Sequence, residues 1–243
     1  MAIFKILTVV LLITGCTSQK DSAYIKAKTA HDKGLETIKN APEPYRSKIA
    51  DSMQKWIPVF KEVYVNDQKN RLVGYGFTKS GLQEQRVLDS ENLKIVTAYL
   101  DTYGWPAVTD MGFIGQRAVG MVIQHAPLAT QEKYYPSLVK AYTWDPHLFE
   151  TLALLEDRIN MRNHRFQYYG SQVVAYQGKQ VLYPVYNIDS LEIRRQQLGF
   201  KMTMADYMKF LRADWNAEAY KQKLPELVTA FKVSDSLGVH YNW

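Results

Sequence analysis

The sequence predicts a mainly α-helical fold, a single helical domain with one β-hairpin near residues 165–186. Through most of the chain, apolar residues recur at spacings of three and four, the period of an amphipathic helix. The segment RFQYYGSQVVAYQGKQVLYPVY, at 165–186, is instead rich in Tyr, Val and Phe around the turn QGK. Strands and helices do not alternate, so a parallel sheet is not expected.

The first sixteen residues, MAIFKILTVVLLITGC, have the layout of a secretory signal peptide. Lys5 supplies a positive charge, residues 6–13 are apolar, and small residues precede Cys16. The apolar run is too short to cross a membrane as a permanent helix. ITGC resembles the lipobox of bacterial lipoproteins, which implies cleavage before Cys16 and its modification with palmitate and other lipid. The alternatives are an ordinary signal peptide with a chance cysteine and a buried cytosolic cysteine.

We therefore divide the chain into a signal peptide (1–15), a polar tether (16–22) and one mainly helical domain (23–243). Cys16 is the only cysteine, so the core must be stable without disulfides. Thr17, and not an aspartate, follows Cys16, so we expect a lipid anchor in the outer membrane of the cell envelope. The net charge of +6 is spread without a basic run, which argues against nucleic acid as a partner.

Five helices are expected in the N-terminal half of the chain. They span residues 23–39, about 45–57, 59–72, 89–104 and 111–126. Prolines separate the first three, glycines at 74, 76 and 81 indicate a loop, and Asp89 or Ser90 is the expected cap of the fourth. The fifth, with Asp110 as its expected cap, is apolar nearly all round, which predicts a central position.

Five further helices are expected in the C-terminal half. They span residues 130–142, 145–161, 189–199, 203–215 and 225–238. Asp145 followed by Pro146 is a strong start signal, and Gly199 is a natural stop. Thr203 with Asp206 three residues later is typical of a helix N-terminus.

An aspartate and an arginine extend the apolar stripe of the predicted 59–72 helix. Asp67 and Arg71 are four residues apart and can form an ion pair, and Gln68 lies beside Asp67. The pair shares a face with Phe60 and Tyr64, which would carry it inward. The alternative is an exposed ion pair that stabilises by about a few tenths of a kcal/mol.

Gln124 and His125 end the predicted central helix. Adjacent helical residues point about 100° apart, so the two side chains should face different neighbours. His125 suits acid–base chemistry near neutral pH. The alternative is a structural histidine that is bonded to a backbone carbonyl.

Further candidates lie in the C-terminal half. Asp157 could orient an imidazole, and Arg158 could bind an anionic group; the alternative is a charge pair at the end of a helix. Gln172 follows a glycine in the predicted hairpin, which can mark a close backbone approach. Arg194 and Arg195 add two cations, for which the alternative is a solvated helix surface.

Several motif classes are missing from the sequence. No H-E-x-x-H motif, cysteine–histidine set or histidine pair at i,i+4 predicts a metal site. No G-x-S-x-G, P-loop or G-x-G-x-x-G sequence occurs, so a serine hydrolase, an ATPase and a nicotinamide enzyme are not expected. We predict neither a metal nor a cofactor.

Short motifs follow one another through the middle of the chain. They are Asp67-Gln68 with Arg71, Asp89 with Asn92, Gly104-Trp105-Pro106, Gln124-His125-Ala126, Asp157-Arg158, Tyr169-Gly170-Ser171-Gln172, and Arg194-Arg195 with Gly199. This series resembles an uncharacterised bacterial family, a domain of unknown function, over about residues 59–212. Ser171 replaces the usual threonine, and residues 163–167 lack an expected glycine. The resemblance implies no activity, because the family has none to transfer.

We expect the candidate residues to gather in one buried polar pocket. They are Asp67, Gln68, Arg71, Gln124, His125, Asp157, Arg158, Gln172 and Arg195, with Trp105 or Tyr169 as a stacking face. One hypothesis is binding of a small polar or anionic ligand, or of an envelope partner. A second is hydrolysis of envelope material, with His125 as acid or base and Asp157 as its orienting partner. A third is a structural polar core without a ligand.

Overall fold

A computed structural model of the chain describes residues 22–43, 49–72 and 78–234. Cys16, the predicted signal peptide and the tether up to Asp21 lie outside the described residues. The predicted start of the second helix at Tyr45, the glycines Gly74 and Gly76, and residues 235–243 also lie outside them.

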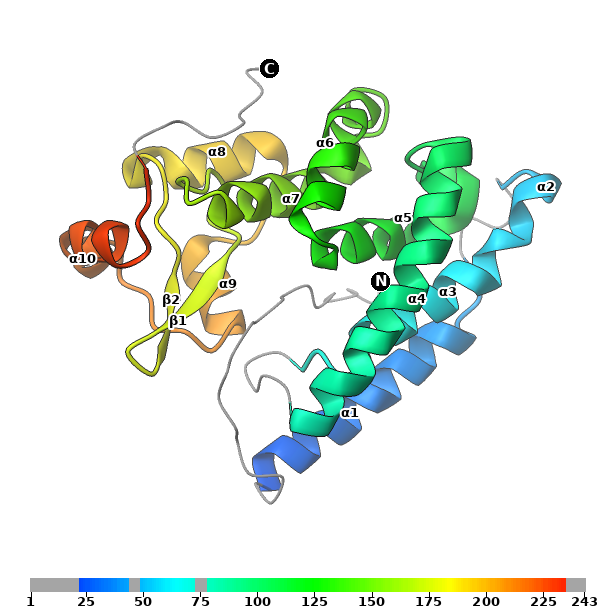
Figure 1. Ribbon diagram of the computed structural model, residues 1–243, viewed down its shortest axis with the longest axis horizontal. Helices are drawn as coiled ribbons and strands as arrows, with labels where there is room; N and C mark the ends of the chain where they lie inside the picture. The colour runs from blue at the N-terminus through cyan, green and yellow to red at the C-terminus, as the bar shows by residue number, and fades with distance from the viewer. Residues whose placement is uncertain (1–21, 44–48, 73–77, 235–243) are drawn as a thin grey trace. The chain divides into compact units, whose positions relative to one another are not determined.

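The described residues are mainly α-helical, with one two-stranded antiparallel hairpin (Figure 1), and this confirms the predicted fold class. The helices are α1 (Ser22–Asn40), α2 (Asp51–Gln54), α3 (Trp56–Gln68), α4 (Lys79–Tyr103), α5 (Val108–His125), α6 (Leu128–Tyr142), α7 (Phe149–Arg162), α8 (Leu191–Leu198), α9 (Met204–Phe210) and α10 (Ala217–Ala230). The strands are β1 (Val173–Tyr176) and β2 (Lys179–Leu182), and 3₁₀ turns occur at η2 (Pro146–Leu148) and η3 (Ile188–Ser190).

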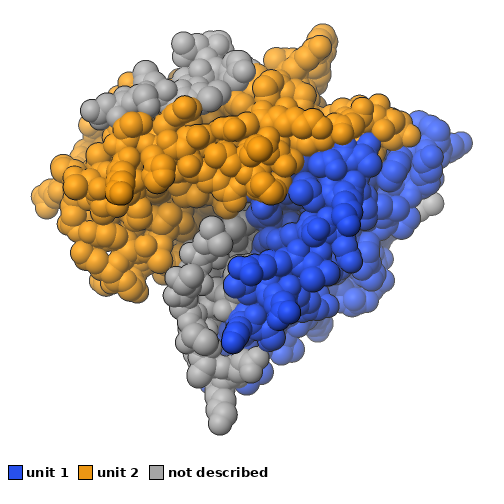
Figure 2. All heavy atoms as spheres, viewed as in Figure 1, with its two compact units in different colours: residues 1–98, 108–125 blue, residues 99–107, 126–243 orange. Residues whose placement is uncertain are grey.

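The chain divides into two compact units (Figure 2). Unit 1 comprises residues 1–98 and 108–125, and unit 2 comprises residues 99–107 and 126–243. We describe each unit by itself, and the single domain expected from the sequence stays a prediction. In the described part of the chain, no helix is both long and apolar enough to cross a membrane.

In unit 1, α3 packs against α5, and α1 packs against α3. The predicted stripe of α3 is confirmed, because Phe60, Val63 and Tyr64 are all buried. Most residues of α5 are buried as well, as its apolar composition predicts. Helix α5 contains a kink at Gly112, whose φ of 77° lies in the left-handed region that favours glycine.

The predicted start of α4 is wrong. The helix begins at Lys79, ten residues before the expected cap, and Gly81 belongs to its first turn. The Thr78 hydroxyl caps this start by accepting a hydrogen bond from the Gly81 amide at 3.1 Å. Asp89 therefore lies in the middle of a helix, where its carboxylate is available to a neighbouring element.

The start and stop signals of unit 2 are confirmed. The Asp145 carboxylate accepts a hydrogen bond from the His147 amide at 3.0 Å, and Pro146 opens the 3₁₀ turn that leads into α7. Gly199 ends α8 with a φ of 120°. The Thr203 hydroxyl accepts from the Asp206 amide at 3.1 Å at the start of α9.

The hairpin lies where it was predicted, with narrower bounds, whereas the predicted bounds of the last helix are wrong by eight residues. β1 and β2 pair with Val173 opposite Leu182, and the two-residue turn at Gln177–Gly178 has positive φ at both positions. The flanks of the predicted 165–186 segment pair only through isolated bridges. Helix α10 begins at Ala217 and contains Pro225, which was expected to start it, because Asn216 caps the earlier position.

Candidate functional site

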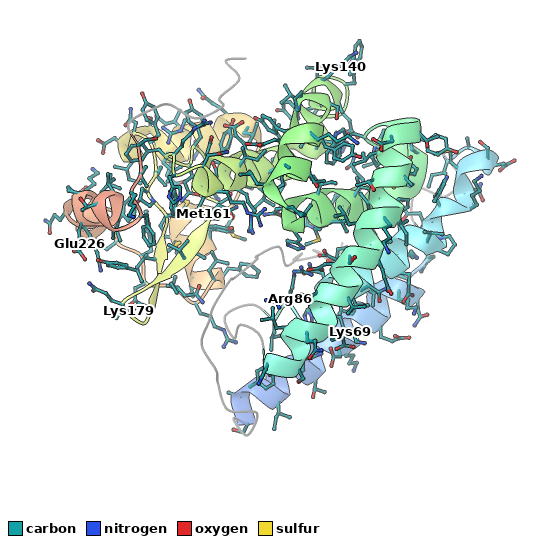
Figure 3. All side chains as sticks on the ribbon, viewed as in Figure 1. Lys69, Arg86, Lys140, Met161, Lys179 and Glu226 are labelled. Atoms are coloured by element: carbon teal, nitrogen blue, oxygen red, sulfur yellow. The ribbon has the colours of Figure 1, made fainter. Side chains whose placement is uncertain are left out.

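The last turn of α3 is the structural centre of the site in unit 1. The final carbonyls of a helix have no partner within it and need donors from elsewhere. Nε2 of Gln85, on α4, donates to the carbonyl oxygens of Asn66 at 3.0 Å and Asp67 at 3.1 Å. The Arg71 guanidinium also donates to the Asp67 carbonyl oxygen. In Figure 3 the labelled residues Lys69, directly after α3, and Arg86, directly after Gln85 on α4, locate these two segments.

Helix α1 supplies donors to the next two carbonyls. Nε2 of His31 lies 2.8 Å from the carbonyl oxygen of Gln68, and Nζ of Lys28 lies 3.2 Å from that of Lys69. Burial lowers the pKa of His31 by more than the hydrogen bond to Gln68 raises it. The Lys28 ammonium also interacts favourably with the dipole at the C-terminus of α3.

The Asp67 carboxylate lies within this turn and is 1% exposed. Its Oδ1 lies 2.7 Å from Nδ1 of His125, and its Oδ2 accepts from Nε2 of Gln68 at 2.7 Å. Arg71 lies 3.5 Å from Oδ1. Burial would raise the pKa of Asp67, but the charges of Arg71 and His125 and the hydrogen bonds from His125 and Gln68 outweigh it and lower this pKa. Asp67 is therefore an ionised carboxylate that contacts an imidazole.

Arg71 connects Asp67 to Asp89. Its NH2 group lies 2.6 Å from Oδ2 of Asp89, and Gln85 donates to Oδ1 of the same carboxylate at 2.8 Å. The Arg71 side chain is 5% exposed, whereas that of Asp89 is 30% exposed. The network thus runs from a buried imidazole to a carboxylate that solvent reaches. We call Asp67, Gln68, Arg71, Gln85, Asp89 and His125 the Asp67 network.

Helix α5 brings His125 to Asp67. The residue is the last of the helix, and its side chain is 3% exposed.

At the other end of α5, the buried Glu43 carboxylate lies against the backbone at the Gly112 kink. A Cβ at Gly112 would lie 2.2 Å from the carboxyl carbon of Glu43. A carboxylate at the start of a helical segment interacts favourably with its dipole. Gln124 precedes His125 and is buried in the same unit.

Asp157 has a different environment, in unit 2. Its Oδ1 accepts from the backbone amides of Tyr168 at 2.6 Å and Tyr169 at 2.9 Å, and its Oδ2 accepts from that of Ser171 at 2.8 Å. Burial raises the pKa of Asp157, and these backbone hydrogen bonds lower it by less. The carboxylate that orients His125 is Asp67, whereas Asp157 holds the turn that precedes β1.

The adjacent arginines of α8 also bind backbone. NH1 of Arg195 donates to the Tyr169 carbonyl at 2.8 Å, and the guanidinium lies 4.5 Å from the Phe200 ring centroid. Arg194 donates to the carbonyl oxygens of Tyr168 at 3.0 Å and Tyr186 at 2.6 Å. Both arginines are buried, so the alternative of a solvated helix surface is wrong.

The remaining predicted residues of unit 2 are buried too. Nε2 of Gln172 donates to the Leu154 carbonyl at 3.3 Å and to the Ser171 hydroxyl at 2.8 Å. Nε1 of Trp105 donates to the Tyr134 carbonyl at 3.2 Å. Arg158 is 2% exposed and Tyr169 is 2% exposed.

The predicted site residues therefore fall into two groups with different bonding. In unit 2, Asp157 and Arg195 bind mainly backbone groups, which are the usual destination of side-chain hydrogen bonds, and Trp105 donates to one backbone carbonyl and to the Ser137 hydroxyl. In unit 1, the Asp67 side chain binds the side chains of both Arg71 and His125. The first pattern fixes loops, whereas the second concentrates titratable groups, as functional sites do.

Sequence reasoning missed two members of the Asp67 network. Gln85 carries no motif and lies in a segment that we expected to be a loop. Asp89 belongs to a motif of the family resemblance, but was expected to cap a helix. Among the described residues, no group of three or more His, Cys, Asp or Glu side chains could hold a metal ion.

Fold and site together define a mainly α-helical protein with a buried charge network in one of its units. A family model described as a family of unknown function, DUF6624, matches residues 71–223, more than half of the chain. The chain belongs to this family, which confirms the resemblance to an uncharacterised family; the individual motifs stay a prediction. Comparison with curated proteins and with solved structures gave no match.

We predict that Asp67→Asn lowers the free energy of unfolding by about 3 kcal/mol near neutral pH, because Arg71 and His125 lose the buried carboxylate that they share. The pKa of Asp67 is lower in the folded chain than in the unfolded chain, so its contribution is complete above about pH 4 and is lost as the pH falls further. Urea unfolding at a series of pH values should show a steeper acid loss for wild type than for the variant.

Asp51→Asn is the matched control, because Asp51 is an exposed aspartate of the same unit. This variant should keep the wild-type pH profile. An acid loss as steep in Asp67→Asn as in wild type would contradict a stabilising ionised Asp67.

Proposed function

We propose that this chain is a lipoprotein of the cell envelope, anchored in the outer membrane through lipidated Cys16, and that its Asp67 network binds a small polar ligand. The anchor rests on the N-terminal sequence alone, where a charged residue, an apolar run and ITGC occur in the order of a lipoprotein signal. Membrane contact through this lipid is the partner that we propose for the N-terminus.

The observation that supports the ligand site is the side-chain network around Asp67. Burying Asp67 and Arg71 has a desolvation cost that their attraction offsets only in part. Clusters of buried titratable groups are found preferentially at functional sites. Asp89 is 30% exposed, so the network has an end at which a ligand can meet it.

The charges of the network favour a polar or cationic ligand over an anion. Two carboxylates, Asp67 and Asp89, stand against one guanidinium, and His125 adds a positive charge only when protonated. An anionic ligand would have to compete with these carboxylates for Arg71. The alternative of an envelope partner requires the same half-buried carboxylate, Asp89, as its point of contact.

A second candidate function is hydrolysis of envelope material, and the Asp67–His125 contact favours it. A carboxylate 2.7 Å from Nδ1 fixes a proton on that nitrogen, so the lone pair of the neutral ring lies on Nε2. Such an imidazole can take a proton from a nucleophile and return it to a leaving group. In this account Asp67 has the orienting role that we first expected of Asp157.

The third hypothesis, a structural polar core without a ligand, fits unit 2 best. There the predicted residues hold backbone groups of the segment before β1, and we propose no ligand for them. Their proposed role is to fix loop conformation.

Cys16→Ser tests the anchor. We predict that a bacterium expressing the wild-type chain incorporates an alkyne-labelled fatty acid into it and carries it in the membrane fraction. The variant should lose the label and leave that fraction, because the thioether attachment point is missing. Ser18→Ala is the control and should behave as wild type. Equal labelling of wild type and Cys16→Ser would contradict the lipoprotein proposal.

His125→Gln tests the ligand site. We predict that a library of polar metabolites contains compounds that raise the melting temperature of wild type by roughly 5 °C at a hundredfold excess over Kd. These compounds should not stabilise His125→Gln, because the ligand site has lost its imidazole. They should still stabilise His147→Gln, a matched control whose histidine also contacts an aspartate but is exposed.

The outcomes separate the hypotheses. Loss of turnover with binding retained in His125→Gln would favour the hydrolase. Compounds that stabilise wild type and His125→Gln equally, and that wild type does not turn over, would contradict a site at the Asp67 network. A lower melting temperature in His125→Gln, with no compound that stabilises wild type, would support the structural reading.

A further inference from the structure

We propose that Asp89 is a positioning residue for His125, acting through Arg71 and Gln85. This inference rests on the proposed function in one respect only, namely that the His125 imidazole takes part in ligand binding or acid–base chemistry. The two carboxylate oxygens of Asp89 lie 2.6 Å from the Arg71 guanidinium and 2.8 Å from Nε2 of Gln85.

Both partners of Asp89 hold the backbone that carries Asp67. Gln85 donates to the Asp67 carbonyl oxygen at 3.1 Å, and Arg71 donates to the same oxygen. Oε1 of Gln85 also accepts from the Asn70 amide at 3.1 Å, so the side chain connects the end of α3 to the turn after it. Asp89 therefore fixes two side chains that together fix the position of Asp67.

Asp89 also sets how the charge of Arg71 is shared. The guanidinium lies 2.6 Å from Asp89 and 3.5 Å from the Asp67 carboxylate, so its closer ion pair is with Asp89. If the charge of Asp89 is removed, Arg71 has Asp67 as its remaining carboxylate partner in this network. Asp67 then stabilises a protonated His125 less, because its own charge is neutralised more fully.

The position of Asp89 on α4 suits this role. It lies four residues after Gln85, so the two side chains occupy the same helix face and reach the end of α3 together. Asn92, three residues further, donates to the Val63 carbonyl of α3 at 3.1 Å and keeps the two helices in register.

The test is a titration of the His125 ring by ¹⁵N NMR, in residues 16–243 carrying Cys16→Ser. The His125 signals are assigned with His125→Gln. We expect Asp89→Asn to move the titration midpoint to lower pH by on the order of half a unit. Glu91→Gln removes a charge from an exposed position of the same helix and should leave the midpoint in place. No ligand is needed, so a failed ligand search and a failed positioning role remain distinguishable.

An unchanged midpoint in folded Asp89→Asn would overturn the proposal, whatever its melting temperature, because Asp89 would then be only a structural contact. An equal movement in Glu91→Gln would overturn it too, since any lost charge on α4 would suffice. If Asp89→Asn does not fold, Asp89→Ser carries the test. This variant also removes the carboxylate that holds Arg71 and Gln85, so the midpoint should again move to lower pH, and an unchanged value would overturn the proposal.

Discussion

The last turn of α3 ends without a glycine, and its carbonyl oxygens need donors from other parts of unit 1. Gln85 of α4, Arg71 of the following turn and His31 of α1 supply them. Because an unsatisfied buried carbonyl costs about 1–3 kcal/mol, this requirement holds three segments of the chain at one place. The same turn carries Asp67, so satisfying the backbone also fixes the carboxylate that contacts His125.

The bonding of the buried polar residues distinguishes the roles of the two units. In unit 2, Asp157 accepts three backbone amides, and Arg195 donates to the carbonyl oxygens of Tyr169 and Met202, so these side chains organise the segments before β1 and after α8. In unit 1, Asp67 and Asp89 share Arg71, and the imidazole of His125 completes the set. A residue type alone does not reveal this difference, because both groups are buried and both contain aspartate and arginine.

Much of the fold could be predicted because its signals are local. Asp145, Thr203 and Gly199 act within one helical turn, and each marks a helix end as expected. The turn at Gln177–Gly178 is equally local. The start of α4 could not be placed, because the polar residues after Lys79 have little apolar periodicity, and the helix begins at the Thr78 cap.

The candidate site was predictable in its members but not in its contacts. Asp67, Arg71 and His125 stand out as polar residues at the ends of apolar stripes. Their partners depend on the register between α3, α4 and α5, which no local pattern encodes. Asp89 and Gln85 were missed for that reason, and the carboxylate that contacts His125 is Asp67 and not the expected Asp157.

The central claim is that an ionised Asp67 holds a proton on Nδ1 of His125. The most direct measurement is the ¹⁵N chemical shift of both ring nitrogens of His125 at a pH where the imidazole is neutral. The account predicts a protonated Nδ1 and an unprotonated Nε2, because a carboxylate 2.7 Å away accepts a hydrogen bond from Nδ1. A neutral ring with its proton on Nε2 would contradict the account, because Nδ1 could not then donate to Asp67.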